Sequence, residues 1–308
     1  MIIPTMIIPT GRGNLLLALA ALAVASMPLW ATPYHMQLAS TALIAAMFAL
    51  SLQLLVGGAG LVSLAHAGFF GLGAYTVYLI GPVSALVSLP VAALTAGVAA
   101  AAIGALALRT TGFFFLMTTL AFGQMLFFLF HDTPLGGGLD GVFIPRPDLI
   151  WAVPKAQRPT VFLLLNLSVL AAMYTGLWRL MRTMFGHALL GIRANEHRMR
   201  AMGHDVHRLK WAAFVLAGAL AGIAGHMAAL TDAFVSPDLL GWHRSAEALL
   251  MILLGGIGAL HGPILGAIAL TLLEELSPLI TERQKLVEGT VILAAVLLLR
   301  RGLAGIGR

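Results

Sequence analysis

The amino-acid sequence predicts an all-α membrane protein, folded as a single transmembrane domain over residues 1–308. Three observations predict this fold class. Hydrophobic residues make up 60% of the chain and charged residues 10%, which leaves too little polar surface for a soluble domain. Apolar segments recur along the chain at about the 17–25 residues that a helix needs to cross a bilayer. Basic residues gather in short stretches between these segments, as they do on the cytoplasmic side of membrane proteins.

The uninterrupted apolar segments define the predicted spans in chain order. The first follows Arg12 and leads to Trp30 and Tyr34, aromatic residues typical of the membrane interface. No clear small-x-small cleavage site follows it, so we interpret it as an uncleaved span rather than a signal peptide. The predicted spans are residues 14–31, 38–56, 84–107, 113–131, 161–181, 211–231 and 284–299.

Two further apolar stretches, residues 57–80 and 246–276, are rich in glycine. Backbone broken by glycine at membrane depth is tolerated where it is buried in protein or lines a water-filled path, so we expect short or broken helices in both. If residues 57–80 cross once and residues 246–276 cross out and back, the chain has about ten crossings, whereas re-entrant segments give about eight. The similar order of glycines and a histidine in the two stretches fits either an inverted internal repeat or similarity of composition alone.

The basic residues predict the orientation of the chain. They fall on the cytoplasmic side in the ten-crossing arrangement, together with both termini. They lie at Arg109, in residues 182–210 and in the C-terminal tail at Arg300, Arg301 and Arg308. The loop at about residues 132–160 mixes acids and bases and then lies outside. The same rule explains the net charge of +6, so we expect membrane lipid and not nucleic acid around this chain.

Several catalytic motifs are missing from the sequence. The chain contains no cysteine, no H-E-x-x-H pair and no G-x-x-x-x-G-K-[ST] phosphate loop. We therefore expect no metal site and no bound cofactor, and we expect that the chain is not an enzyme. Any ATP, with its Mg²⁺, would have to be bound and hydrolysed by another subunit.

The most informative stretch is a charged segment, residues 182–210, that separates two predicted spans. Asn195 is a suitable N-cap and Gly203 a suitable C-terminal stop, which predicts a short helix between them. This helix cannot enter the bilayer, because each central arginine would cost about 2.5–3.5 kcal/mol. It is either an ordinary basic loop that only orients the chain or a helix that docks to another protein. Its length, helical pattern and glycine boundary favour docking. Its basic residues are Arg182, Arg193, Arg198, Arg200, Arg208 and Lys210, against Glu196 and Asp205.

The charged segment resembles the coupling loop of ABC importer permeases and, more specifically, that of the M-type (LivM) subunits of branched-chain amino acid permeases. The residues that carry this resemblance are Arg193, Asn195, Glu196, Ala201 and Gly203. The resemblance continues in register from about residue 38 to the end of the chain. It includes the stretches VGGAGLVSLAHAGFFGLGAYT, TTGFFFLMTTLAFGQML and VSPDLLGWHRSAEALLMILLGGIGALHGPILGA.

The resemblance implies a type II-like importer permease of about eight to ten helices with glycine-broken elements. It implies a second homologous permease, two ATP-binding cassette subunits and a periplasmic substrate-binding protein as partners, in the bacterial inner membrane. About residues 186–208 would fit a groove in an ATPase subunit and transmit its closure. The cargo would be branched-chain or related amino acids.

Polar and aromatic residues inside predicted spans are candidates for the translocation pathway, because polar groups there are costly unless they are satisfied. Helix packing is the alternative reading for each of them. The candidates are Ser63, His66, Phe69, Phe70, Tyr75, Thr118 and Gln124. We expect His226 near the outer end of its span, in contact with solvent. Ser245 and Glu247 lie where an outside loop enters the membrane, and they could cap the helix that starts there or touch the binding protein, with capping the preferred interpretation.

Two alternative functions are compatible with the composition. The same importer architecture could carry urea, short amides or sugars. An ion-coupled secondary transporter would instead need acidic residues at the centres of its spans. The acidic residues of this chain cluster at span ends, which favours the importer.

Overall fold

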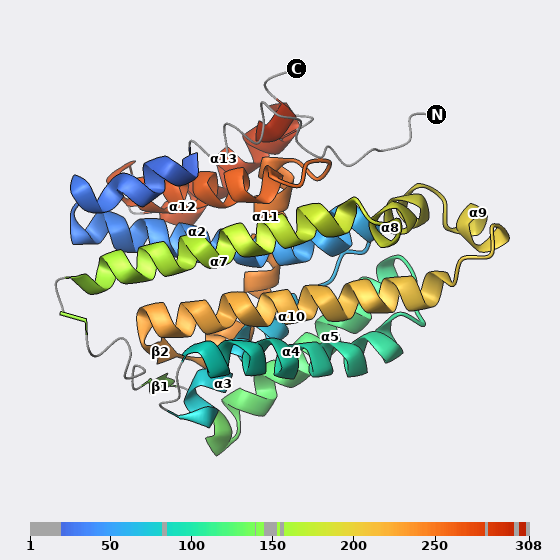
Figure 1. The fold of residues 1–308 in the computed structure, drawn as a ribbon, viewed down its shortest axis with the longest axis horizontal. Helices are drawn as coiled ribbons and strands as arrows, with labels where there is room; N and C mark the ends of the chain where they lie inside the picture. The colour runs from blue at the N-terminus through green and yellow to red at the C-terminus, as the bar shows by residue number, and fades with distance from the viewer. Residues whose placement is uncertain are drawn as a thin grey trace.

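The computed structural model describes residues 20–81, 85–138, 140–144, 153–154, 157–280, 283–298 and 302–305. It confirms the helical fold class of a multi-pass membrane protein (Figure 1). Among the described residues, 5 helices are long and apolar enough to cross a membrane: Pro33–Ala59, Val87–Ala107, Phe113–His131, Arg158–Met181 and Val206–Asp232. Residues 14–19 of the first predicted span and the C-terminal arginines lie outside the described residues, and Ala20–Leu29 is helical.

The elements follow one another in the order that the apolar segments predict. The α-helices are α2 (Pro33–Gln53), α3 (His66–Ile80), α4 (Ala85–Ala107), α5 (Phe113–His131), α7 (Arg158–Met181), α8 (Met184–Ala194), α9 (Glu196–Ala201), α10 (Val206–Asp232), α11 (Trp242–Gly255), α12 (Gly262–Ile280) and α13 (Gln284–Leu298). Short helical turns are η1 (Met27–Leu29), η2 (Leu54–Ala59), η3 (Pro134–Gly136), η5 (Pro237–Leu240) and η6 (Leu303–Gly305).

A two-stranded antiparallel ribbon joins the predicted external loop to the end of α10. Strand β1 (Val142–Phe143) pairs with β2 (Phe234–Val235), with Val142 opposite Val235. The ribbon and α9 lie at opposite ends of the helical body (Figure 1). This separation agrees with the predicted placement of residues 132–160 and of the charged segment on opposite sides of the membrane.

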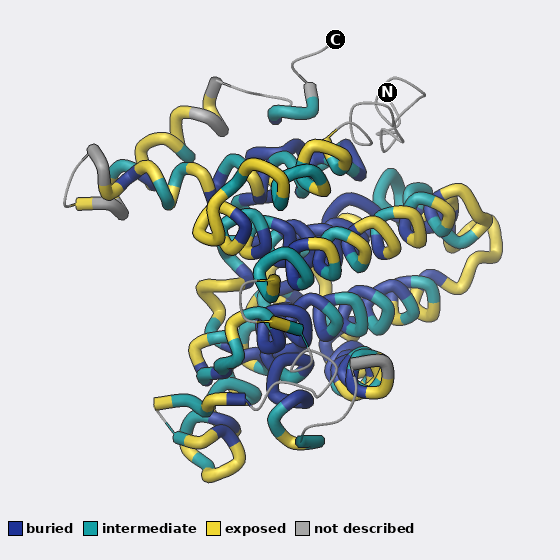
Figure 2. The backbone as a smooth tube through the Cα atoms, turned by 60° about the vertical axis from the view of Figure 1, so that its left-hand side comes forward, coloured by how far each residue is buried: buried dark blue, intermediate teal, exposed yellow. Residues whose placement is uncertain are grey.

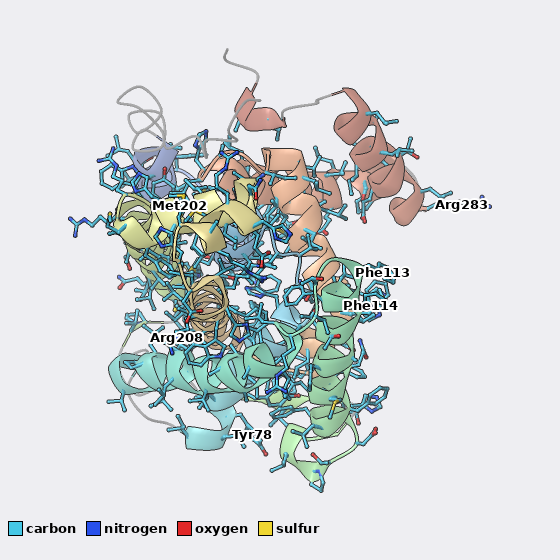
Figure 3. The ribbon with its side chains drawn as sticks, turned by 90° about the vertical axis from the view of Figure 1, so that its right-hand side faces the viewer. Tyr78, Phe113, Phe114, Met202, Arg208 and Arg283 are labelled. Carbon is cyan, nitrogen blue, oxygen red and sulfur yellow. The ribbon has the colours of Figure 1, made fainter. Side chains whose placement is uncertain are left out.

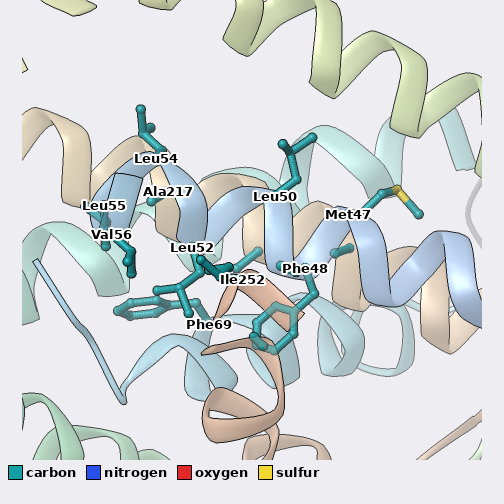
Figure 4. Close-up of a cluster of buried hydrophobic side chains, with 14 of the residues drawn as sticks. Met47, Phe48, Leu50, Leu52, Leu54, Leu55, Val56, Phe69, Ala217 and Ile252 are labelled. Atoms are coloured by element: carbon teal, nitrogen blue, oxygen red, sulfur yellow. The ribbon is translucent and has the colours of Figure 1, made fainter. Parts of the chain in front are cut away.

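Helices α2 and α10 form the centre of the body. Their apolar windows are 89% and 72% buried, against 33% or less for the windows of α4, α5 and α7. The outer helices keep exposed apolar faces, as lipid or a partner subunit requires (Figure 2). Phe113 and Phe114, at the start of α5, point away from the body (Figure 3). The interior is a continuous apolar cluster that includes Leu52, Phe69 and Ala217 (Figure 4).

Glycines let α10 approach its neighbours closely. A Cβ at Gly222 would lie 2.4 Å from the Cβ of Ala96 on α4, and one at Gly225 would lie 1.8 Å from the carbonyl oxygen of Phe70 on α3. Small residues at such contacts allow helix packing in membranes. His226 is buried in this tight region, and its Nε2 lies 3.3 Å from the Oγ of Ser88. The expectation of a solvated His226 was therefore wrong, because α10 packs against α4 at this depth.

The first glycine-rich stretch contains a helix break, as predicted. The "first break" is residues 54–65: one π-helical stretch, Leu54–Ala59, followed by irregular chain up to the start of α3 at His66. The chain turns at Gly60, whose φ of 72° is a left-handed conformation that favours glycine. Side chains from other helices satisfy its backbone. The N–H of Leu64 donates to Thr119 Oγ1 at 3.2 Å, and Ser245 Oγ donates to the carbonyl of Leu64 at 2.9 Å.

The second glycine-rich stretch is also broken, as predicted. The "second break" is residues 256–261, between α11 and α12, and begins at Gly256 with a φ of 107°. Gln53 Nε2 donates to the carbonyls of Ile257 at 2.8 Å and Ala259 at 3.1 Å. A Cβ at Gly57 would lie 3.2 Å from the carbonyl oxygen of Ile257. The two breaks are therefore neighbours in space, although about 200 residues separate them in sequence.

Candidate functional site in the charged segment and the helix breaks

The short helix predicted in the charged segment is present as α9. Asn195 Oδ1 accepts a hydrogen bond from the N–H of Arg198 at 3.0 Å, which is the N-cap that the sequence predicts. Gly203 has a φ of 86° and follows the end of the helix, as expected for a C-terminal stop. Asp205 Oδ1 then accepts from the N–H of Arg208 at 3.1 Å and caps α10. Asn195 and Asp205 thus each begin a helix at a fixed position.

Glu196 makes one ion pair within α9 and one that connects α9 to α10. Its Oε1 lies 2.6 Å from Arg200 Nη2, and its Oε2 lies 2.5 Å from Lys210 Nζ. The Lys210 side chain is 11% exposed, so the second pair is partly shielded from water. Partial burial acts to raise the pKa of Glu196, but the hydrogen bond and charge of Lys210, followed by Arg200, outweigh it and hold that pKa below its usual value. The carboxylate is therefore ionised at neutral pH and holds α9 against the body.

Arg193 connects the charged segment to the first break. It lies in the last turn of α8, and its Nη1 donates to the carbonyl oxygen of Gly57 at 2.6 Å. A Cβ at Gly60 would lie 3.2 Å from Arg193 Cγ, so the side chain lies closely along the break. Partial burial lowers the pKa of Arg193, yet an arginine remains protonated at any physiological pH. A permanent charge therefore holds the π-helical turn.

The end of α9 is a continuous exposed stretch of the charged segment. Ala201, Gly203 and His204 are exposed, and the Met202 side chain is 65% exposed. Met202 and Arg208 lie at the end of the body that faces the viewer in Figure 3. Met199 faces inward instead and packs on Gly191 of α8. The residues that carried the resemblance thus divide into inward contacts (Arg193, Glu196) and an exposed tip (Ala201, Gly203).

Most of the candidate pathway residues on α3 lie inside the body. Phe69 packs edge-on against His66 and Phe214. Tyr75 stacks on Phe130, and its hydroxyl donates to the carbonyl of Gly136 at 3.1 Å. These positions are those of packing residues, and their role in the pathway stays a prediction.

The remaining candidates differ in their surroundings. Ser63 is buried, and its Oγ has no hydrogen-bond partner among the described residues. Thr118 donates to the carbonyl of Phe114 in its own helix. Phe70 and Gln124 are the candidates that line cavities.

Gln124 lines a groove of about 760 Å³ that α5, η5, α11, α12 and α13 border. A volume of this size is within the range of small-molecule sites. The sequence reasoning considered Gln124 and Glu247 but missed the other charged residues that line it. These are Asp238, Arg244, Glu274 and Glu288. The available signal was the set of charges next to apolar runs in residues 238–247 and 274–288.

Ser245 caps a helix, but not its own. Its Oγ accepts a hydrogen bond from the N–H of Ala67 at 2.8 Å, in the first turn of α3, while it donates to Leu64. The prediction that Ser245 caps its own helix was wrong, because the N-cap of α11 is Gly241 and the tertiary fold brings Ser245 to the start of α3. Ser245 thereby ties the start of α11 to the first break.

Comparisons with known proteins agree with this architecture. The family model described as "Branched-chain amino acid transport system / permease component" matches residues 34–297. The chain is 30% identical to the high-affinity branched-chain amino acid transport system permease protein LivM of Escherichia coli (strain K12), over 97% of this chain and 78% of that protein. It is 29% identical to the protein of the same name from Salmonella typhimurium, over the same shares.

A shorter match relates the chain to a different importer. It is 38% identical to the autoinducer 2 import system permease protein LsrC of Klebsiella pneumoniae, over 33% of this chain and 31% of that protein. No solved structure matches the chain. Because the family model covers most of the chain and the LivM relative matches along nearly all of it, the chain belongs to the LivM-type permease components of branched-chain amino acid transport systems.

Proposed function

We propose that this chain is the membrane-spanning permease subunit of a bacterial ABC importer that carries branched-chain or related amino acids. A periplasmic binding protein delivers the substrate, and two partner ATPase subunits bind ATP and Mg²⁺ and drive transport. A second homologous permease completes the pathway. The complex lies in the inner membrane, with both termini of this chain in the cytoplasm. The family match and the names of the LivM relatives support this proposal.

One observation carries the mechanism: Arg193 joins the charged segment to the first break, where Gly57 lies near the end of the candidate membrane span Pro33–Ala59. The exposed tip of α9 is the surface that an ATPase subunit grips. When the ATPases close on ATP, α8 and α9 move together, because Met199 packs on Gly191. Arg193 transfers this movement to Gly57, and Gln53 links the same region to the second break. The path then opens alternately to the two sides.

The test replaces Arg193 with alanine in the assembled complex and measures uptake into proteoliposomes with the binding protein outside and ATP inside. Loss of a hydrogen bond from a charged donor costs about 1.5–3 kcal/mol, so we expect uptake to fall roughly tenfold or more. Assembly and basal ATP hydrolysis should persist, because the contact with the ATPase lies at the tip. The matched control is Arg109→Ala, an exposed arginine outside the charged segment, which should transport normally. Normal uptake by Arg193→Ala would contradict the coupling role.

The match to LsrC makes a second cargo class a candidate. An importer of this architecture could carry an autoinducer-2-like molecule, since a third of the chain is similar to that permease. The ligand that the partner binding protein retains distinguishes the two. Retention of leucine, isoleucine or valine supports the first cargo, and retention of a carbohydrate-like molecule supports the second.

A further inference from the structure

We infer that Arg244 and Glu247 form the contact site for the charged ends of an α-amino acid, and that a small apolar cavity beside them takes its branched side chain. This inference rests on the proposed function, because it assigns a substrate contact within the same permease. It concerns the permease itself, separate from the specificity of the binding protein.

Two cavities meet at this pair of residues. Arg244 and Glu247 line both the groove of about 760 Å³ and a side cavity of about 80 Å³. The groove is mostly charged and polar around them. The side cavity lies between α2, α3, η5, α10 and α11. Most of its wall is apolar, and Thr41 and Asp232 line it beside the ion pair. The apolar residues are Ile44, Ala45, Phe48, Phe70, Ala228, Leu239 and Met251. A polar space and an apolar space thus adjoin at one pair of opposite charges.

The ion pair is open enough to accept a ligand. Arg244 Nη1 lies 3.5 Å from Glu247 Oε2, which is longer than the roughly 2.7–2.9 Å of a tight charged hydrogen bond. The two side chains are 52% and 35% exposed, so water screens the attraction between their charges and keeps it weak. A guanidinium group binds a carboxylate with two parallel hydrogen bonds. A zwitterionic amino acid can therefore place its carboxylate on Arg244 and its ammonium group on Glu247.

The side cavity has the size of a short aliphatic branch. An apolar cavity of roughly 150 Å³ holds a benzene molecule, and a single water needs about 10–15 Å³. The side cavity, at about 80 Å³, is about half that size, which suits a branch of three or four carbons better than an aromatic ring. Phe48 and Phe70 pack against each other with ring centroids 4.8 Å apart, so this wall is well defined. These walls favour leucine, isoleucine and valine over phenylalanine.

The site is also connected to the coupling element. Ser245 lies between Arg244 and Glu247 on α11 and holds the first break through Leu64 and Ala67. The other end of that break carries the Arg193 contact. A movement of α8 and α9 that reshapes the first break would therefore shift the turn of α11 that holds both charges. Release of the substrate then follows from the same motion that opens the path.

The experiment uses the whole complex in proteoliposomes and measures uptake of leucine and alanine at saturating binding protein, together with binding-protein-stimulated ATP hydrolysis. Arg244→Gln and Glu247→Gln should each lower leucine uptake by about tenfold or more, the effect expected for one charged hydrogen bond. Stimulated ATP hydrolysis should continue, because the coupling element is intact. Asp132→Asn and Arg179→Gln, which change exposed charges far along the chain from the pair, are the matched controls and should match the unaltered complex.

A third variant tests the side cavity. Ala45→Leu adds carbons to the cavity wall and should lower leucine uptake more than alanine uptake, a change in selectivity that simple loss of stability does not produce. Equal loss of both substrates, or native uptake by both charge variants, would overturn the inference. The proposed function fails separately, if the unaltered complex takes up no branched-chain amino acid while another ligand of the binding protein stimulates its ATPase.

Discussion

The two helix breaks lie side by side but are held in different ways. The first break is held by polar side chains from three separate elements, through Thr119, Ser245 and Arg193. In the second break, Gln53 donates to two carbonyl groups, and backbone lies in direct contact with backbone at its edges. Hydrogen bonds to side chains can exchange partners during a motion, whereas backbones in contact cannot. Under the proposed function, we expect the first break to change shape more than the second.

The largest expected effect comes from filling the contact beside the second break, where the last residue of α11 meets the first residue of α12. A Cβ at Gly255 would lie 1.8 Å from the carbonyl oxygen of Gly262, so Gly255→Val forces two backbones apart. We expect a loss of at least about 3 kcal/mol of stability, seen as little folded protein by size-exclusion chromatography in detergent. Gly289→Ala is the control, because a Cβ there meets no atom within 4 Å. A folded and stable Gly255→Val protein would show that the second break is not rigid.

A smaller effect separates the two breaks by function. Gln53→Ala and Ser245→Ala each remove a side chain that bonds two backbone groups of a break or of the helix that follows it. Each should cost roughly 1–3 kcal/mol, because buried groups lose their partner. Uptake per folded complex should fall severalfold in Ser245→Ala and stay near normal in Gln53→Ala.

Thermal unfolding in detergent measures the stability of Gln53→Ala and Ser245→Ala, and uptake in proteoliposomes measures their transport. Ser168→Ala is the control, since Ser168 is exposed and bonds only within its own helix. Equal uptake per folded complex by the Gln53 and Ser245 variants would remove the distinction between the breaks.

The smallest expected effect concerns the ion pairs of Glu196, which hold α9 in the charged segment. The pKa of Glu196 is lower in the folded protein than in an unfolded chain, so its ion pairs stabilise α9 fully above the unfolded value of about 4.3. This stabilisation is lost as the pH falls through the lower, folded-state pKa. Hydrogen exchange of residues 196–203 should therefore rise in acid beyond its intrinsic pH dependence. Glu196→Gln should show no such acid-dependent step, and a step of the same size in that variant would assign it to another group.

The sequence predicts the local features of this molecule well. Both breaks follow from dense glycine, and α9 follows from a capping Asn195 and a terminal Gly203, because these signals act within a few residues. Partners far apart in sequence are a different matter. The contact between Ala67 and Ser245 spans 178 residues, and the contact between Arg193 and Gly57 spans 136. No periodicity encodes such pairs.

The same reason explains the candidates that sequence reasoning placed imperfectly. The aromatic chemistry of Phe69 and Tyr75 predicts a place on the translocation pathway, yet Phe69 packs against α10 and Tyr75 bonds to the predicted external loop. No local pattern in the sequence distinguishes Arg244 from other charged residues at the ends of apolar segments. Its position between two cavities depends on how α11 packs on α2 and α3.

The bond from Arg193 ends on a main-chain oxygen, and this has an evolutionary consequence. Every amino acid carries that acceptor, so a substitution at position 57 does not delete it. Such a substitution is limited instead by space, because a Cβ there would lie 2.6 Å from Gln53 Nε2. A variant that loses the arginine likewise cannot be rescued by swapping charges between the two positions. Compensating changes should instead arise where another donor can reach the same turn.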